Sequence, residues 1–170
     1  MDDRAGDGLV IGMVLGAMAG VIGVYAMDQV SQSIYRREGA SARAQEMAAR
    51  PGGLDPAHAL ADRVTRAAGM ELSNKVDNSV GMVIHYAVGV IPAAVYGALR
   101  DRVGILGALR GLIFGAMTFV AGDEYAGPKL GIAAPPSMYP WQAHGRGLAA
   151  HLAFGAATDA ALRVLKGPPR

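Results

Sequence analysis

The sequence predicts an all-α membrane protein, built as a polytopic bundle of four transmembrane helices. Apolar residues make up 52% of the 170-residue chain and charged residues only 18%, which is unlike an average soluble domain. The uncharged run from Leu9 to Met27 is about as long as the 20 apolar residues that cross a bilayer. Three further apolar segments follow this run, so we expect four membrane spans in all.

The predicted spans belong to a single membrane domain that covers residues 1–170. The five-residue link "RDRVG" between the second and third spans predicts that these two helices are antiparallel neighbours. The acidic start "MDDRAGDG" lacks the basic segment of a secretory signal, so we expect a retained membrane anchor. The four spans are predicted at residues 8–28, 78–99, 103–122 and 142–165.

The polar loop between the first two spans, residues 29–77, is predicted to be helical and to lie outside the membrane. Asp55 is a suitable N-cap, Pro56 suits the first helical position, and Gly69 suits the end of the helix. Apolar residues recur between them at helical spacing, which predicts an amphipathic helix. A second helix is expected upstream, ended by the Pro-Gly-Gly sequence at 51–53.

Glycines recur at four-residue intervals on every predicted span. A glycine within a helix costs about 1 kcal/mol relative to alanine. In lipid, however, small residues four positions apart let two helix backbones approach closely. We therefore predict that these glycines form helix-packing faces, a glycine zipper. They are Gly8, Gly12, Gly16 and Gly20 in the first span, Gly81 and Gly89 in the second, Gly107, Gly111 and Gly115 in the third, and Gly147 and Gly155 in the fourth.

The same spacing suggests an internal duplication. The segment "GMVLGAM" in the first span overlays "GLIFGAM" in the third, and "GMVIHYAVG" in the second overlays "GLAAHLAFG" in the fourth. A two-helix hairpin that is repeated in one orientation accounts for both overlays. His85 and His151 then occupy equivalent positions, at one depth in the membrane.

Polar residues collect near one membrane surface, and ionisable residues inside spans default to a functional hypothesis. Three interpretations stay open for the two span histidines. They hydrogen-bond across helices and only hold the bundle together, they form a pair that binds protons or a ligand, or they ligate haem or a metal ion. The candidate intramembrane polar site contains His85, His151, His144, Asp123 and Glu124, and Asp28 and Asp77 lie near the same surface.

A second polar pair is expected near the opposite surface. Arg110 in the third span and Asp159 in the fourth lie at similar predicted depths, so they are a candidate ion pair. In the alternative, Arg110 reaches the membrane surface and Asp159 binds Arg163, one helical turn further on.

The sequence contains no pattern typical of an enzyme. The chain has no cysteine, which excludes disulfides and thiolate chemistry. The motifs G-x-S-x-G, H-E-x-x-H and G-x-x-x-x-G-K-[ST] are absent. The net charge of +2 is too small and too scattered to indicate nucleic-acid binding. We predict a protein without enzymatic activity, without a metal site and without a cofactor, unless haem or a metal binds His85 and His151.

The segments "VGMVIHYAVGVIPAAVYGALRDR", "GLIFGAMTFVAG" and "RGLAAHLAFGAA" resemble the YagU-like bacterial inner-membrane proteins, a small four-span family of unknown function. The resemblance covers the second to fourth spans and rests on a histidine in the second and fourth. It implies a four-helix fold in the bacterial inner membrane and, for some members, a role in acid resistance. It implies no catalytic or binding residues.

These observations predict an inner-membrane protein that takes part in a pH response, or in the movement of protons or small solutes along a histidine-bearing face. The alternatives are an accessory subunit of a larger membrane complex and a haem or metal carrier. The expected partners are the lipid bilayer and either a second copy of the chain or a larger membrane complex. Both termini are predicted to be cytoplasmic, because Arg100, Arg102, Arg163, Lys166 and Arg170 flank the short loop and the tail, although the basic residues of the first loop argue for the opposite orientation.

Overall fold

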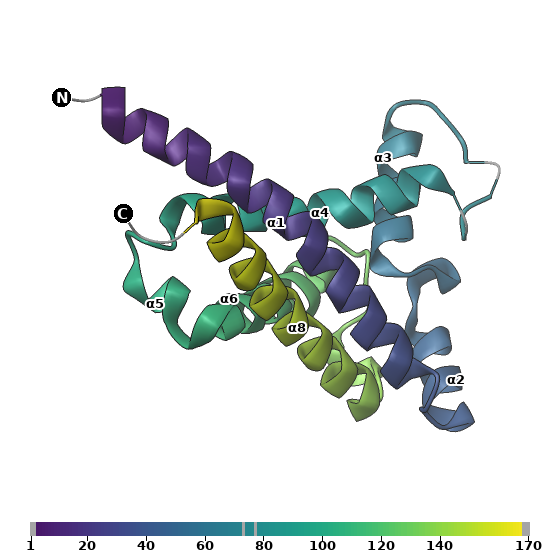
Figure 1. Ribbon diagram of the computed structural model, residues 1–170. Helices are drawn as coiled ribbons and strands as arrows, with labels where there is room; N and C mark the ends of the chain where they lie inside the picture. Colours follow the sequence, from purple (N-terminus) through teal and green to yellow (C-terminus); the bar gives the residue numbers. More distant parts are fainter. Residues whose placement is uncertain (1–2, 73, 77, 168–170) are drawn as a thin grey trace.

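The computed structural model describes residues 3–72, 74–76 and 78–167, and within them the chain is all-α, without a strand (Figure 1). Asp77 and Arg170 lie outside the described residues. The α-helices are α1 (Asp3–Tyr35), α2 (Ala40–Ala49), α3 (Pro56–Ala67), α4 (Ser79–Leu99), α5 (Gly104–Gly107), α6 (Leu112–Thr118), α7 (Gly127–Lys129) and α8 (Trp141–Lys166). Shorter 3-10 turns are η1 (Pro51–Gly53), η2 (Ala108–Gly111) and η4 (Pro136–Met138), and η3 (Phe119–Ala126) is π-helical.

Four helical stretches are long and apolar enough to cross a membrane, which is compatible with an integral membrane protein. This confirms the predicted number of candidate spans. The first helix is longer than predicted, because the polar residues after Met27 continue it to Tyr35 instead of beginning the loop at residue 29. The four stretches are Gly6–Tyr35, Ser79–Leu99, Gly104–Lys129 and Trp141–Lys166.

The third span differs most from its prediction as an unbroken helix over 103–122. Leu109 and Arg110 take left-handed backbone conformations with φ of 51° and 53°, and Gly111 follows with φ of 84°. Such angles interrupt a right-handed helix. The apolar helix begins again at α6 and continues through η3 to the end of α7. The candidate span therefore ends at Lys129, beyond the predicted end at residue 122.

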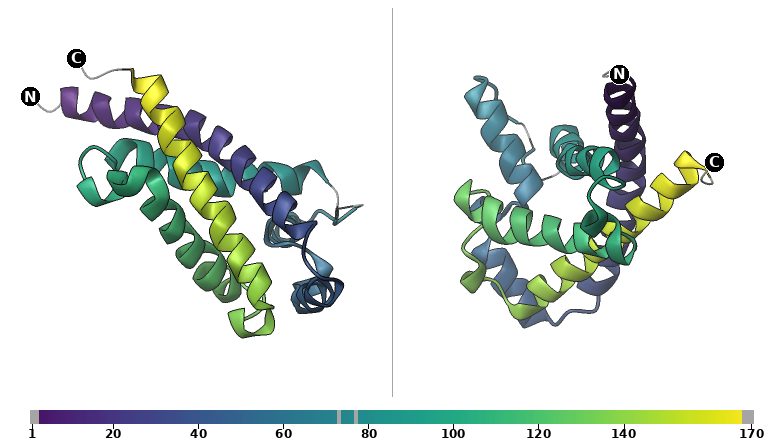
Figure 2. Two further views of the ribbon diagram at one scale, coloured as in Figure 1. Left: turned by 60° about the horizontal axis from the view of Figure 1, so that its bottom comes forward. Right: turned by 90° about the vertical axis from the view of Figure 1, so that its left-hand side faces the viewer.

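Helix α1 contacts two of the other long helices. It packs against α4 and against α8, and α8 also packs against α6. The N-terminal end of α1 and the C-terminal end of α8 lie at one end of the bundle (Figures 1 and 2). We call this the terminal end. The opposite end carries α2 and α3, and α3 packs against the start of α4.

The backbones of α1 and α4 approach closely along glycines. A Cβ atom on Gly12 would lie 2.8 Å from the carbonyl oxygen of Gly97. A Cβ on Gly16 would overlap the carbonyl oxygen of Ala93, and one on Gly20 would lie 2.5 Å from the Ala93 Cβ. Protein atoms do not approach this closely, so any side chain at these positions forces the two helices apart.

Helices α6 and α8 meet in the same manner. Gly111 and Gly155 face each other, and a Cβ on either would overlap the carbonyl oxygen of the other. A Cβ on Gly115 would overlap the carbonyl oxygen of His151. Both helix pairs thus depend on the absence of a side chain along one face.

The two hairpins do not pack in equivalent register. In the overlay of the repeats, Gly16 corresponds to Gly115, and His85 corresponds to His151. Gly115 faces the backbone of His151, but Gly16 faces Ala93 instead of His85. The difference of about eight residues is roughly two helical turns. The overlay of the two sequence repeats is not matched by a repeated helix contact.

Of the other predicted packing glycines, Gly89 and Gly147 lie close to side chains of neighbouring spans and Gly81 lies close to a side chain of α3, whereas Gly8 and Gly107 do not. Gly8 and Gly107 lie beside the loop that follows α4. A Cβ atom placed on either glycine would lie 3.4 Å or more from the nearest atoms, which belong to arginines, so neither glycine is at a close helix contact. Gly8 faces Arg102 and Gly107 faces Arg100, whereas Gly81 faces the ring of His58, Gly89 the side chain of Val24, and Gly147 the ring of Phe119.

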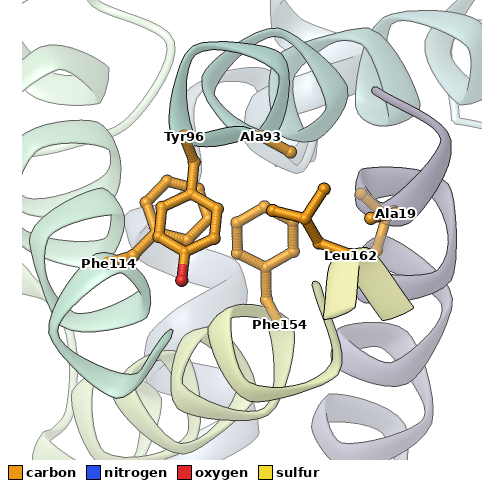
Figure 3. Packing of buried hydrophobic residues seen from close by; sticks show 7 residues of the cluster. Ala19, Ala93, Tyr96, Phe114, Phe154 and Leu162 are labelled. Atoms are coloured by element: carbon orange, nitrogen blue, oxygen red, sulfur yellow. The ribbon is translucent and has the colours of Figure 1, made fainter. Parts of the chain in front are cut away.

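A small apolar cluster fills the middle of the bundle (Figure 3). The rings of Tyr96 and Phe114 stack with their centroids 4.3 Å apart, and Phe154 lies 5.3 Å from Phe114. This contact joins α4 to α6, the two helices that the short link "RDRVG" predicts to be neighbours. The cluster consists of Ala19, Val24, Ala93, Tyr96, Phe114, Phe154 and Leu162.

The two predicted helices of the first loop are present. The carboxylate of Asp55 accepts hydrogen bonds from the N–H groups of Ala57 and His58, so it caps α3 as predicted. Gly69 has a φ of 74° just past the end of this helix, where a left-handed residue commonly ends a helix. Helix α2 ends immediately before the Pro-Gly-Gly segment at 51–53.

Candidate functional site: paired histidines at one end of the bundle

The chain has four histidines, and each lies beside a carboxylate at the end of the bundle that carries α2 and α3. In the first pair, His85 Nε2 lies 2.8 Å from Asp28 Oδ1. Asp28 follows the apolar run of α1, and His85 lies two turns into α4. The two helices are antiparallel neighbours, so the end of one brings its carboxylate to the beginning of the other.

The second pair joins α8 to the third membrane helix. His151 Nδ1 lies 2.9 Å from the carbonyl oxygen of Gly147 and 3.8 Å from Asp123 Oδ2. Since a carbonyl oxygen only accepts, Nδ1 carries the proton in this contact. The imidazole also packs against the ring of Phe119, with centroids 5.6 Å apart. His151 is therefore held between a backbone acceptor, an aromatic ring and a carboxylate.

The third pair has acceptors at both ring nitrogens. His144 Nδ1 lies 2.6 Å from Glu124 Oε1, and Nε2 lies 3.0 Å from the carbonyl oxygen of Pro136. The carbonyl group requires a proton on Nε2. The contact with Glu124 then needs one further proton, either on Nδ1 or on the carboxyl group. Both contacts of the ring are therefore hydrogen bonds only when His144 and Glu124 together hold one proton more than a neutral imidazole and an ionised carboxylate hold.

The fourth pair lies on α3 and is absent from the predicted site. His58 Nδ1 lies 2.8 Å from Asp55 Oδ2, and the ring of His58 lies against Gly81 at the start of α4. The sequence analysis uses Asp55 only as a helix cap. The second carboxylate oxygen of Asp55 is free to bind the side chain three residues later in the sequence. The Asp-x-x-His spacing at the start of a predicted helix was therefore the signal for this pair.

The structure brings the five predicted site residues to one end of the bundle, but it gives each histidine a carboxylate partner. His85 lies against Asp28 of α1 and not against His151 of α8. Among the described residues, no three His, Asp or Glu side chains are arranged to hold a metal ion.

Asp159 lies at the terminal end and does not pair with Arg110. It is fully buried and accepts hydrogen bonds from the Tyr96 hydroxyl at 2.6 Å and from Arg100 Nε at 2.5 Å. Arg163 Nε lies 3.0 Å from its second oxygen, as the alternative predicts. Arg110 is exposed, because the left-handed residues of the broken third span turn it away from the bundle. Arg100 is the partner that the sequence analysis missed.

The carboxylate next to this cluster is more exposed. Asp101 accepts from Lys166 Nζ and from Arg100 Nη1, each at 2.7 Å. The hydrogen bond from Lys166 lowers the pKa of Asp101, burial opposes this effect, and the bond from Arg100 adds to it. Asp101 links the loop after α4 to the end of α8, at the surface of the protein.

A network of ion pairs links α2 to α8 near the histidine pairs. Arg146 donates to Glu38 and to Glu46 at 2.6 Å, and its guanidinium group lies 4.9 Å from the ring centroid of Tyr35. Burial raises the pKa of Glu46, but the hydrogen bonds from Arg146 and Arg50 outweigh it, so the net pKa is lowered. Glu46 therefore stays charged near neutral pH, which distinguishes this network from the histidine pairs.

Comparisons of the chain with protein-family models, with curated proteins and with solved structures found no match. The resemblance to the YagU-like proteins stays a prediction from the sequence. The bacterial inner membrane, the orientation of the termini, and the accessory-subunit and haem-carrier alternatives also stay predictions. The function is argued below from the geometry of the described residues.

Proposed function

We propose that this chain is an integral membrane protein without enzymatic activity that responds to pH at one membrane surface. The observation that carries this proposal is the pairing of every histidine with a carboxylate at the same end of the bundle. Imidazole is the side chain that ordinarily changes its charge between pH 5 and 8. A change in proton occupancy therefore alters the charge of four contacts at one surface together.

Three of these contacts connect separate elements, so their charge affects how the elements are held. The pair of His85 and Asp28 joins α4 to α1, and the pair of His144 and Glu124 joins α8 to η3. A protonated imidazole forms a charge-assisted hydrogen bond with a carboxylate, which is about twice as strong as a neutral one. Acid thus strengthens the links between these helices, and base weakens them.

The structure favours a response at one surface over conduction of protons through the bundle. On α8, Phe154 lies between His151 and Asp159, and on α4, Ala93 lies between His85 and Tyr96. Phe154 and Ala93 both belong to the buried apolar cluster of Figure 3. Proton transfer requires a continuous chain of polar groups or water, and this cluster separates the polar groups at the two ends.

The single tryptophan of the chain gives a test. Trp141 begins α8, three residues before His144, and its side chain is 76% exposed. We expect its fluorescence in nanodiscs to change between pH 8 and pH 5, with a midpoint in that range. His144→Gln removes most of this change. The matched variant His58→Gln, on α3, retains it.

Two outcomes of this experiment would contradict the proposal. A tryptophan emission that is constant from pH 8 to pH 5 in the wild-type protein contradicts the proposed response. A change of the same size in the His144→Gln variant also contradicts it, because the signal then does not come from the pair of His144 and Glu124 beside Trp141.

A further inference from the structure

A polar groove lies along the C-terminal turns of α1, on a part of the chain that the proposed function does not use. Its volume is about 240 Å³. Its lining offers two guanidinium groups, two side-chain amides and a hydroxyl, which are all hydrogen-bond donors. The lining residues are Gln29, Gln32, Ser33, Arg36 and Arg37.

The two arginines of this groove have no carboxylate partner among the described residues. The side chain of Arg36 contacts only the Gln32 amide oxygen, at 3.4 Å. Glu38 is the next acid along the chain, and it is bound by Arg146. The groove therefore carries two positive charges without a counter-ion from the protein, and an anion is the ligand that this charge favours.

The groove begins at the depth of lipid headgroups and extends beyond it. The apolar run of α1 ends at Met27, and a rise of 1.5 Å per residue puts Gln29 about 3 Å and Ser33 about 9 Å beyond it. The headgroup layer extends roughly 5–8 Å beyond the hydrocarbon core on each side. Trp141, exposed at the start of α8 on the same side, is typical of this layer. Arginine side chains reach back toward it from the turn after α1.

We infer that this groove binds the phosphate group of an anionic phospholipid. The guanidinium groups of Arg36 and Arg37 suit the phosphate oxygens, which they bind in a bidentate manner. The amides and the hydroxyl suit the ester oxygens and the polar part of the headgroup. The partial negative charge at the C-terminus of α1 opposes an anion, but two full positive charges outweigh it. This inference does not rest on the proposed pH response.

Native mass spectrometry of the full chain, released from nanodiscs of mixed phosphatidylglycerol and phosphatidylcholine, tests this inference. The wild-type protein is expected to retain phosphatidylglycerol in preference to phosphatidylcholine. The double variant Arg36→Gln/Arg37→Gln lowers this retention about thirtyfold, because each basic residue near an anionic surface contributes about 1 kcal/mol. The matched double variant Arg102→Gln/Arg110→Gln removes the same charge from exposed residues at the terminal end and leaves the retention unchanged.

A second measurement separates a lipid headgroup from a soluble phosphate ester. Binding of glycerol 1-phosphate is measured for the protein in nanodiscs of phosphatidylcholine alone. If the soluble ester binds in a manner that depends on Arg36 and Arg37, and phosphatidylglycerol is not retained, the ligand is not a lipid. Equal losses of lipid in the two double variants, or no preference for the anionic lipid, overturn the site itself.

Discussion

Leucine at position 16 is expected to destabilise the folded bundle by at least about 3 kcal/mol, at the upper end of what overpacking costs. A Cβ at Gly16 overlaps the Ala93 carbonyl oxygen and lies 2.9 Å from the Gly97 Cα. These atoms belong to the backbone of α4 and cannot move by a change of rotamer. Helix α1 cannot retreat either, because α8 packs against it as well. The better helix propensity of leucine, about 1 kcal/mol, does not offset this overlap.

Thermal unfolding in detergent measures this effect, and Gly6→Leu is the matched control on the same helix. No atom lies within 4 Å of a Cβ placed at Gly6, so leucine there has unchanged or slightly raised stability. If the two variants are equally stable, the face of α1 that carries Gly16 does not pack against α4.

The second large effect is expected for Asp159→Ala, with a loss of about 3–5 kcal/mol in the free energy of unfolding. Removing this carboxylate leaves Arg100 and the Tyr96 hydroxyl without their buried acceptor. Arg163 also loses its ion pair with Asp159, and Arg100 keeps only the more exposed Asp101. Unfolding by a denaturing detergent measures the loss.

Asp101→Ala is the matched control, because Asp101 also binds Arg100 but its side chain is 53% exposed. An exposed ion pair contributes at most about 1 kcal/mol, so this variant keeps most of the stability. If the two alanine variants lose the same amount, burial of Asp159 is not what holds the terminal end together.

The approximate positions of the helices and the polar end of the bundle follow from the sequence, because both depend on simple rules. Apolar length sets the spans, and in an antiparallel bundle the end of α1 must meet the start of α4. That rule alone brings Asp28 and His85 to one surface. The capped helix at Asp55 was predictable for a similar reason, since its signals are local.

The partner of Asp159 was not predictable from residue spacing. Counting residues along an unbroken third span places Arg110 at the depth of Asp159, but the left-handed residues at 109–111 turn Arg110 outward. The apolar sequence continues on both sides of this break and gives no sign of it. That His85 pairs with Asp28 and not with His151 also depends on how α1, α4 and α8 pack together, which residue spacing does not give.

The protonation of the histidine rings tests the central claim most directly. Ring-nitrogen NMR of histidine-labelled protein in nanodiscs, recorded from pH 8 to pH 5, distinguishes neutral imidazole from imidazolium at each site. We predict that the signals of the paired rings change across this range, and that Asp28→Asn alters the change at His85 while Asp101→Asn does not. Four rings that keep one neutral form from pH 8 to pH 5 would contradict a pH response at this end of the bundle.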